Sequence, residues 1–176
     1  MKKFKLLLLD ANVVIHLFRL GVWQRVIELC DVHLARTIVE SEAQFYETDD
    51  GERQYFDLRP HVNTGEVAVF DVTPSDLAAF RGSFDPSYFE KLDPGETESL
   101  AYLLNLKETG WICSADKIVF RVLGNHYSGQ YGISLEEVLQ AVGLGRKLPR
   151  QFTKTFREEW TRKGSEERIR GIGLRE

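Results

Sequence analysis

The sequence contains few cysteines and no long hydrophobic run. Its 176 residues include two cysteines, and the longest apolar run near the start, residues 6–9, follows three lysines. That run is far too short for a membrane helix, and it lacks the length and cleavage site of a signal peptide. We therefore expect a cytoplasmic chain with no membrane partner, in which Cys30 and Cys113 are reduced thiols of the core.

Charge is distributed unevenly along a chain of ordinary composition. Hydrophobic residues make up 43% and charged residues 28%, which suits one domain with a substantial core. Residues 145–176 carry ten Lys/Arg and five Asp/Glu, whereas the remainder carries 13 basic and 22 acidic residues. A basic tail on an acidic body suggests a polyanionic partner, although a solvated amphipathic tail explains the same pattern.

Strand-like and helix-like segments alternate along the chain. Short apolar runs at 4–9, 32–35, 66–72 and 111–114 read as strands, and the segments between them carry helical patterns and caps. This alternation predicts an α/β sandwich around a central, mostly parallel sheet. Beyond Pro149, the residues Phe152, Phe156 and Trp160 recur every four positions, which predicts a helix over about 151–162 that buries an aromatic stripe.

Two local patterns carry more specific expectations. Thr37 to Glu40 has the spacing of a capping box, which predicts a helix running to about Tyr46. Residues 54–62 and 66–72 flank an Asn-Thr-Gly sequence, which is compatible with a hairpin.

Asp10 follows directly on the apolar run at the start of the chain. In open parallel sheets, ligands bind outside the carboxyl ends of the strands, so an acidic residue at this point is placed where function usually lies. An Asp in the same position can also cap the helix that follows. Taken alone, Asp10 supports both interpretations.

Asp116 repeats the arrangement of Asp10, because it follows the short apolar run Ile112–Cys113 and precedes a helix. Two strands that end in Asp at one sheet edge would bring two carboxylates together, and each would oppose ionisation of the other. A divalent cation removes that penalty, and Mg²⁺ prefers a few carboxylates plus water. The pair therefore predicts a metal site.

Further acids accompany this pair. Glu42 lies in the segment predicted to be helical after Thr37, and the sequence Asp93-Pro94-Gly95-Glu96 predicts a helix start with an acid in its first turn. Glu98 is two positions further on and so faces a different side of that helix. One of Glu96 and Glu98 is expected to point at the metal.

Four segments together resemble the PIN domain family, which includes VapC-type toxins and RNA-processing nucleases. They are LLLLDANVVI, TIVESEAQFY, GETESLAYLL and ICSADKIVFRVLG, and the resemblance covers roughly residues 4–145. The third segment has a G-E-x-E pattern where many members carry Asp. Counting back from Ala101 favours Glu96 as the equivalent acid, with Glu98 as the alternative.

The resemblance implies a PIN-like nuclease domain at 1–145. The basic residues and the helical spacing beyond it predict a basic helical extension at 146–176. It implies a catalytic Mg²⁺ or Mn²⁺ site in which Asp10, Glu42, Glu96 and Asp116 are the ligands and Asn12 and Ser114 support them. The implied activity is metal-dependent hydrolysis of RNA, as an endoribonuclease. Further implications are the role of toxin with an antitoxin partner, and a homodimer. The alternative is a nucleic-acid-binding or scaffold module with little catalysis.

Two basic residues follow Asp116 on the predicted helix. Lys117 and Arg121 could contact phosphates near the metal, and a solvated helix face explains them equally well.

Overall fold

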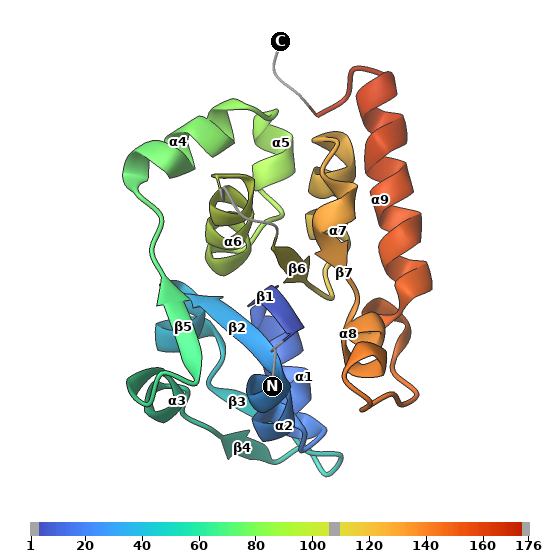
Figure 1. Ribbon diagram of the computed structural model, residues 1–176. Helices are drawn as coiled ribbons and strands as arrows, with labels where there is room; N and C mark the ends of the chain where they lie inside the picture. The colour runs from blue at the N-terminus through green and yellow to red at the C-terminus, as the bar shows by residue number, and fades with distance from the viewer. Residues whose placement is uncertain (1–3, 106–109, 174–176) are drawn as a thin grey trace.

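The computed structural model describes residues 4–105 and 110–173, and a five-stranded sheet lies at its centre. The strand order is β5-β2-β1-β6-β7, and every neighbouring pair is parallel. These strands are β1 (Phe4–Leu9), β2 (Cys30–Ala35), β5 (Val67–Phe70), β6 (Trp111–Cys113) and β7 (Gly132–Ile133). Helices flank the sheet (Figure 1), so the expected α/β class with a parallel sheet is confirmed and is consistent with a PIN-like sandwich.

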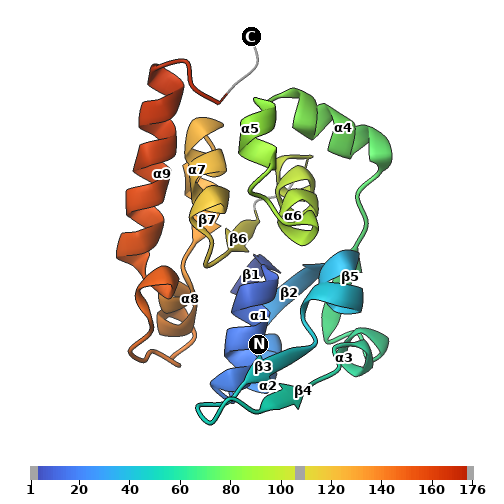
Figure 2. The same ribbon diagram turned by 180° about the vertical axis from the view of Figure 1, so that it is seen from behind.

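The helical elements account for most of the remaining chain. They are α1 (Ala11–Arg19), α2 (Trp23–Leu29), the π-helical turn η1 (Ile38–Glu42), α3 (Arg59–Asn63), α4 (Pro74–Gly82), α5 (Pro86–Phe89), α6 (Pro94–Asn105), α7 (Lys117–Asn125), η2 (Gly129–Tyr131), α8 (Leu135–Ala141), η3 (Arg150–Phe152) and α9 (Lys154–Ile169). A second, antiparallel sheet pairs β3 (Phe45–Glu47) with β4 (Arg53–Tyr55) and lies beside α1 (Figure 2).

Burial explains why β1 occupies the middle of the sheet. Its residues Leu7, Leu8 and Leu9 are fully buried, as expected for a strand covered on both faces. Both cysteines are buried in the core, as expected. Across the described residues, no helix combines the length and the apolarity needed to cross a membrane.

Side-chain caps set several helix starts. Asp116 accepts a hydrogen bond from the Ile118 amide at the start of α7, and Ser134 forms a complete capping box with Glu137 at α8. The helix expected after Asp93 is present as α6; its predicted end near Lys107 lies outside the described residues.

The expected capping box at Thr37 does not form. The Thr37 hydroxyl instead donates to Glu98 at 2.7 Å, and only the short turn η1 follows before the chain turns into β3. The expected hairpin is also wrong. Residues 59–63 form α3, and β5 pairs in parallel with β2 because its apolar side chains complete the core on that side.

The C-terminal helix α9 lies along α7 in both views (Figures 1 and 2). Their backbones approach closely at two glycines, since a Cβ added to Gly124 would lie 2.0 Å from the Thr161 carbonyl oxygen, and one added to Gly164 would meet Arg121 equally closely. A half-buried ion pair of 2.6 Å between Arg121 and Glu167 joins the same two helices. The extension is therefore packed on the body.

The aromatic stripe is divided between two elements. Thr153 caps α9 by accepting from the Phe156 amide, so the helix starts at Lys154 and Phe152 lies in the preceding turn η3. Phe156 packs edge-on against Phe120 of α7, whereas Phe152 is buried elsewhere. The expected burial is thus complete for Phe152 and partial for Phe156 and Trp160.

Candidate functional site

The carboxyl ends of β1 and β6 meet at the centre of one sheet edge. Leu9 of β1 is in register with Cys113 of β6, and the Asp10 amide donates to the Cys113 carbonyl at 3.1 Å. The chain leaves β1 toward β2 on one side, while β6 and β7 lie on the other. The edge between β1 and β6 is therefore a topological switch point, where ligands of open parallel sheets bind.

One buried hydroxyl links the two strand-end acids. Ser114 Oγ donates to Asp10 Oδ2 at 2.9 Å and accepts from the Asp116 amide at 3.0 Å. Ser114 is fully buried, so these bonds face no competition from water. The hydroxyl therefore fixes Asp10 and the start of α7 relative to each other.

Asp10 is held as a buried acid that does not cap α1. It occupies the N-cap position, but its side chain makes no capping hydrogen bond, and it is 2% exposed. Burial raises the pKa of Asp10 to about 6; the Ser114 hydrogen bond opposes this rise and the Asp116 charge adds to it. Its carboxylate thus does not serve as the helix cap that is the alternative to a metal ligand.

Glu96 brings a third carboxyl group to Asp10 and Asp116. It lies in the first turn of α6, is 1% exposed, and accepts at Oε2 from the Asp93 amide at 3.1 Å. Its other oxygen, Oε1, is buried with no hydrogen-bond partner. Burial, and then the charge of Asp10, raises the pKa of Glu96 to about 9, with Asp116 contributing further.

Glu42 lies against the start of α6. Its Oε1 accepts from the Gly95 amide at 3.1 Å, and a Cβ on Gly95 would lie 2.4 Å from the other Glu42 oxygen. Only glycine therefore permits this approach. Burial raises the pKa of Glu42, the Gly95 amide lowers it, and the charges of Asp93 and Glu98 raise it further.

The five predicted acids thus separate into two neighbouring groups. Asp10, Glu96 and Asp116 interact with one another, while Glu42 interacts with Glu98, whose carboxylate accepts from Thr37. The two groups adjoin because Gly95, the contact of Glu42, immediately precedes Glu96.

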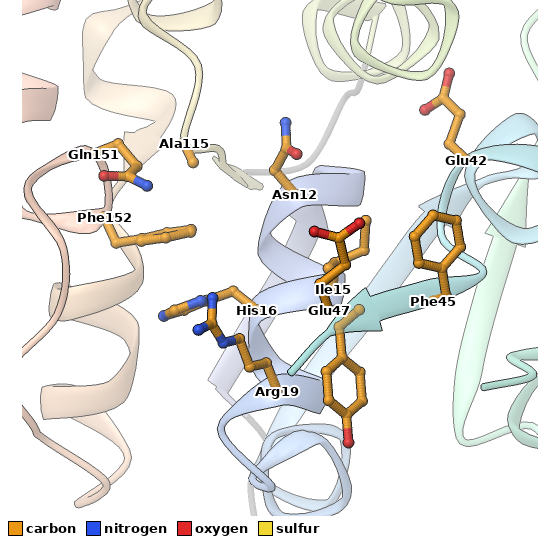
Figure 3. Close-up of a pocket in the computed structure, with 11 residues that line it drawn as sticks. Asn12, Ile15, His16, Arg19, Glu42, Phe45, Glu47, Ala115, Gln151 and Phe152 are labelled. Atoms are coloured by element: carbon orange, nitrogen blue, oxygen red, sulfur yellow. The ribbon is translucent and has the colours of Figure 1, made fainter. Parts of the chain in front are cut away.

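A pocket of about 530 Å³ adjoins the acids, and Figure 3 shows it between α1, β3 and the turn before α9. Asn12, Glu42 and Ala115 line the end of the pocket nearest the acids. The two basic residues after Asp116 do not line this pocket: Arg121 pairs with Glu167, and the Lys117 ammonium lies 5.5 Å from the Trp160 ring centre.

The donor set has the chemistry of a hard-cation site. Carboxylate oxygens suit Mg²⁺ and Mn²⁺, and a buried carboxylate oxygen without a partner is the kind of atom that a cation would satisfy. Within residues 4–105 and 110–173, no three His, Cys, Asp or Glu side chains are arranged so that together they could hold a metal ion. Mg²⁺ is commonly bound by one or two carboxylates with water as the remaining ligands, so two of these acids would suffice for such an ion.

Comparisons with known proteins add nothing to this geometry: no family model, curated protein or solved structure matches the chain. The resemblance to PIN domains therefore stays a prediction that depends on the motifs in the sequence.

Two contributors to the site were missed at the level of sequence. The Thr37 hydroxyl was assigned to a helix cap, although Thr37 also lies just beyond the end of β2 at the same sheet edge. Asp93 is predicted only to belong to a helix start, whereas its amide holds Glu96 in place. The aromatic wall of the pocket has no signal in the sequence, because β3 and η3 are brought together only by the tertiary fold.

Proposed function

We propose that the chain is a metal-dependent ribonuclease that hydrolyses phosphodiester bonds at the edge between β1 and β6. The observation that carries this proposal is the buried Glu96 Oε1, which has no partner although its carboxyl group interacts with Asp10 and Asp116. Asp10 and Glu96 are both buried, and the charge of Asp10 opposes the ionisation of Glu96, so this pair of acids contributes little to stability. A cation-binding role explains why such an arrangement is present.

Asp10, Glu96 and Asp116 would hold Mg²⁺ or Mn²⁺ partly through water, with Glu42 beside them. A bound divalent cation supplies a Lewis acid that activates water and stabilises negative charge on the phosphoryl group. Ser114 keeps the Asp10 carboxylate in place, and the Asp93 amide orients Glu96. Glu42, half-buried between Gly95 and the pocket, is placed to orient a water or accept its proton.

RNA cleavage measured with and without metal tests this function. We expect cleavage of single-stranded RNA with Mg²⁺ or Mn²⁺ and none with EDTA, and we expect Asp10→Asn and Asp116→Asn to lower the rate by at least about a hundredfold. Asp31→Asn is the matched control, because it removes an exposed carboxylate near the opposite end of β2. Unchanged cleavage by both site variants would refute the proposal.

The non-catalytic alternative makes a different prediction. A scaffold or binding module would bind RNA equally well with EDTA and would show no thermal shift with Mn²⁺. The antitoxin partner and the homodimer implied by the resemblance stay predictions. Co-purification with a short amphipathic protein would support the first, and the mass of the purified protein in solution tests the second.

A further inference from the structure

The pocket beside the acids has the size of a ligand site. Its volume of about 530 Å³ lies within the range of about 300–1,000 Å³ typical of small-molecule pockets. It shares Asn12 and Glu42 with the edge where the acids gather, so a group bound here would be adjacent to the reacting phosphate. Figure 3 shows Phe45 on one side of α1 and Gln151 and Phe152 on the other.

Aromatic side chains from the small antiparallel sheet form one wall. Phe45 and Tyr46 of β3 both line the pocket, and both are only half-buried. The Arg53 guanidinium carbon lies 4.6 Å from the Phe45 ring centre and covers one face of that ring, which leaves the other face for a base. Bases stack on aromatic rings in this way in single-stranded nucleic acid complexes.

The turn η3 forms the opposite wall. The Phe152 ring stacks on His16 of α1, with ring centres 4.1 Å apart and planes inclined by 13°. This contact anchors η3 on α1 and leaves the neighbouring Gln151 amide exposed at the pocket. The C-terminal extension therefore contributes directly to a surface next to the acids.

The polar groups of the pocket match the edge and backbone of a nucleotide. The side-chain amides of Asn12 and Gln151 can each donate and accept hydrogen bonds, as base edges require. Arg19 lines the pocket and pairs with the exposed Asp49 at 2.6 Å. Exposed ion pairs are weak, so a phosphate can replace Asp49 at little cost.

We propose that this pocket binds one unstacked nucleobase of a single-stranded RNA substrate, held between the β3 aromatics and the η3 turn, with Arg19 on an adjacent phosphate. The identity of the ligand as RNA rests on the proposed nuclease function. A base within a duplex is stacked on both faces and cannot enter, so the pocket selects single strands. The extension after residue 145 thereby takes part in substrate selection.

Equilibrium binding in EDTA tests the pocket separately from catalysis. The probe is a short, fluorescently labelled single-stranded RNA of mixed sequence, compared with the same strand in a duplex. We expect the single strand to bind at least about tenfold more tightly. Phe45→Ala and Tyr46→Ala should each raise Kd by about fivefold to a hundredfold, the range of one lost base stack.

Two further variants separate the contacts and guard against misfolding. Gln151→Ala, at an exposed position, should weaken binding without altering the circular dichroism spectrum or Tm. Arg19→Gln should lower the slope of log Kd against log salt by about 0.7, as expected for one lost phosphate contact on a single strand. Tyr127→Asn is the control: it removes an aromatic ring that is 66% exposed outside the pocket, and Asn tolerates the positive φ of that position.

The outcomes of these binding and cleavage measurements test the base-binding pocket and the nuclease function separately. Equal affinity for duplex and single strand, or unchanged Kd in the Phe45, Tyr46 and Gln151 variants, would overturn the pocket assignment even if metal-dependent cleavage is found. RNA binding that requires these side chains, without cleavage under any metal, would support the pocket and count against the nuclease.

Discussion

Ser114 Oγ donates a 2.9 Å hydrogen bond to the buried carboxylate of Asp10, although the two residues are 104 positions apart in the sequence. The parallel register of β1 and β6 produces this contact, since Leu9 and Cys113 are paired and the next residues of both strands leave the sheet side by side. The same hydroxyl accepts from the Asp116 amide. One serine thus links two of the proposed metal ligands.

Removing this hydroxyl should weaken the metal site. In Ser114→Ala, the Asp10 carboxylate loses its orienting donor, and we expect metal affinity to fall by about 10- to 100-fold, as for other residues that support metal ligands. The unsatisfied Asp116 amide should also lower the free energy of unfolding by about 1–3 kcal/mol. Mn²⁺ titration followed by calorimetry measures the first effect. Ser83→Ala, at an exposed position, should change neither quantity.

Replacing Glu96 by Gln should stabilise the metal-free protein at alkaline pH. The folded-state pKa is raised from 4.5 to about 9 for Glu96 and from 3.8 to about 6 for Asp10. The protonated Asp10 and Glu96 side chains therefore contribute stability to the folded state that is fully present below the unfolded pKa values. This stability is lost as the pH rises through about 6 for Asp10 and then about 9 for Glu96. Glu96→Gln carries no proton to lose, so its advantage over the wild type should grow with pH.

Thermal unfolding in EDTA between about pH 5 and pH 9 measures this effect. Near pH 8 we expect the Glu96→Gln variant to be more stable by about 1–3 kcal/mol, which corresponds to about 2–4 °C in Tm per kcal/mol for a domain of this size. Glu52→Gln, at an exposed position, is the control. A variant that is less stable than the wild type at every pH would show that Glu96 is a stabilising structural residue.

The two acids of the third motif should differ in metal binding. Glu96 interacts with Asp10 and Asp116, whereas Glu98 accepts from Thr37 and lies near Glu42. We expect Glu96→Gln to abolish the thermal shift produced by Mn²⁺ and Glu98→Gln to reduce it only slightly. The reverse order would assign Glu98 as the ligand.

The contact between α7 and α9 should depend on Gly124. A Cβ at this position would lie 2.0 Å from a backbone oxygen of α9, so the helices must separate in Gly124→Ala. We expect a loss of about 1–3 kcal/mol or more in the free energy of unfolding, because backbone atoms cannot move aside as side chains do. Gly82→Ala, which meets no atom within 4 Å and lies in helix α4, is the control and should not lower the free energy of unfolding in urea.

The sequence predicts the parts of the fold that follow from local patterns. The apolar run before Asp10 predicts β1, and the helix start at Asp93-Pro94-Gly95-Glu96 predicts α6. Apolar periodicity and capping both depend on neighbours within a few positions, which is why these elements are visible without a structure.

Contacts between residues far apart in the sequence explain where the structure differs from the prediction. Thr37 has the spacing of a helix cap, but Glu98, 61 positions away, takes its hydroxyl. The segment at 66–72 can pair with either of two neighbours, and burial against β2 prevails over a local hairpin. Phe152 has the helical spacing of Phe156 and Trp160 in the sequence. The Thr153 cap nevertheless starts α9 after Phe152, whose ring stacks on His16.

The candidate site also has a part that local sequence patterns predict and a part that depends on the tertiary fold. Two acids at strand ends are predictable from sequence because parallel strands share an edge. The division of the acids into one group around Asp10 and another around Glu42 is not, because it depends on how η1 and the start of α6 pack together.

A crystal soaked with Mn²⁺ tests the central claim most directly. We expect one anomalous peak at the edge between β1 and β6, with carboxylate oxygens of Asp10, Glu96 and Asp116 at about 2.1 Å or linked to the ion through water. The peak should be absent from crystals of Asp116→Asn. A wild-type crystal with no peak at these acids, at a Mn²⁺ concentration that supports RNA cleavage, would contradict the proposed metal site.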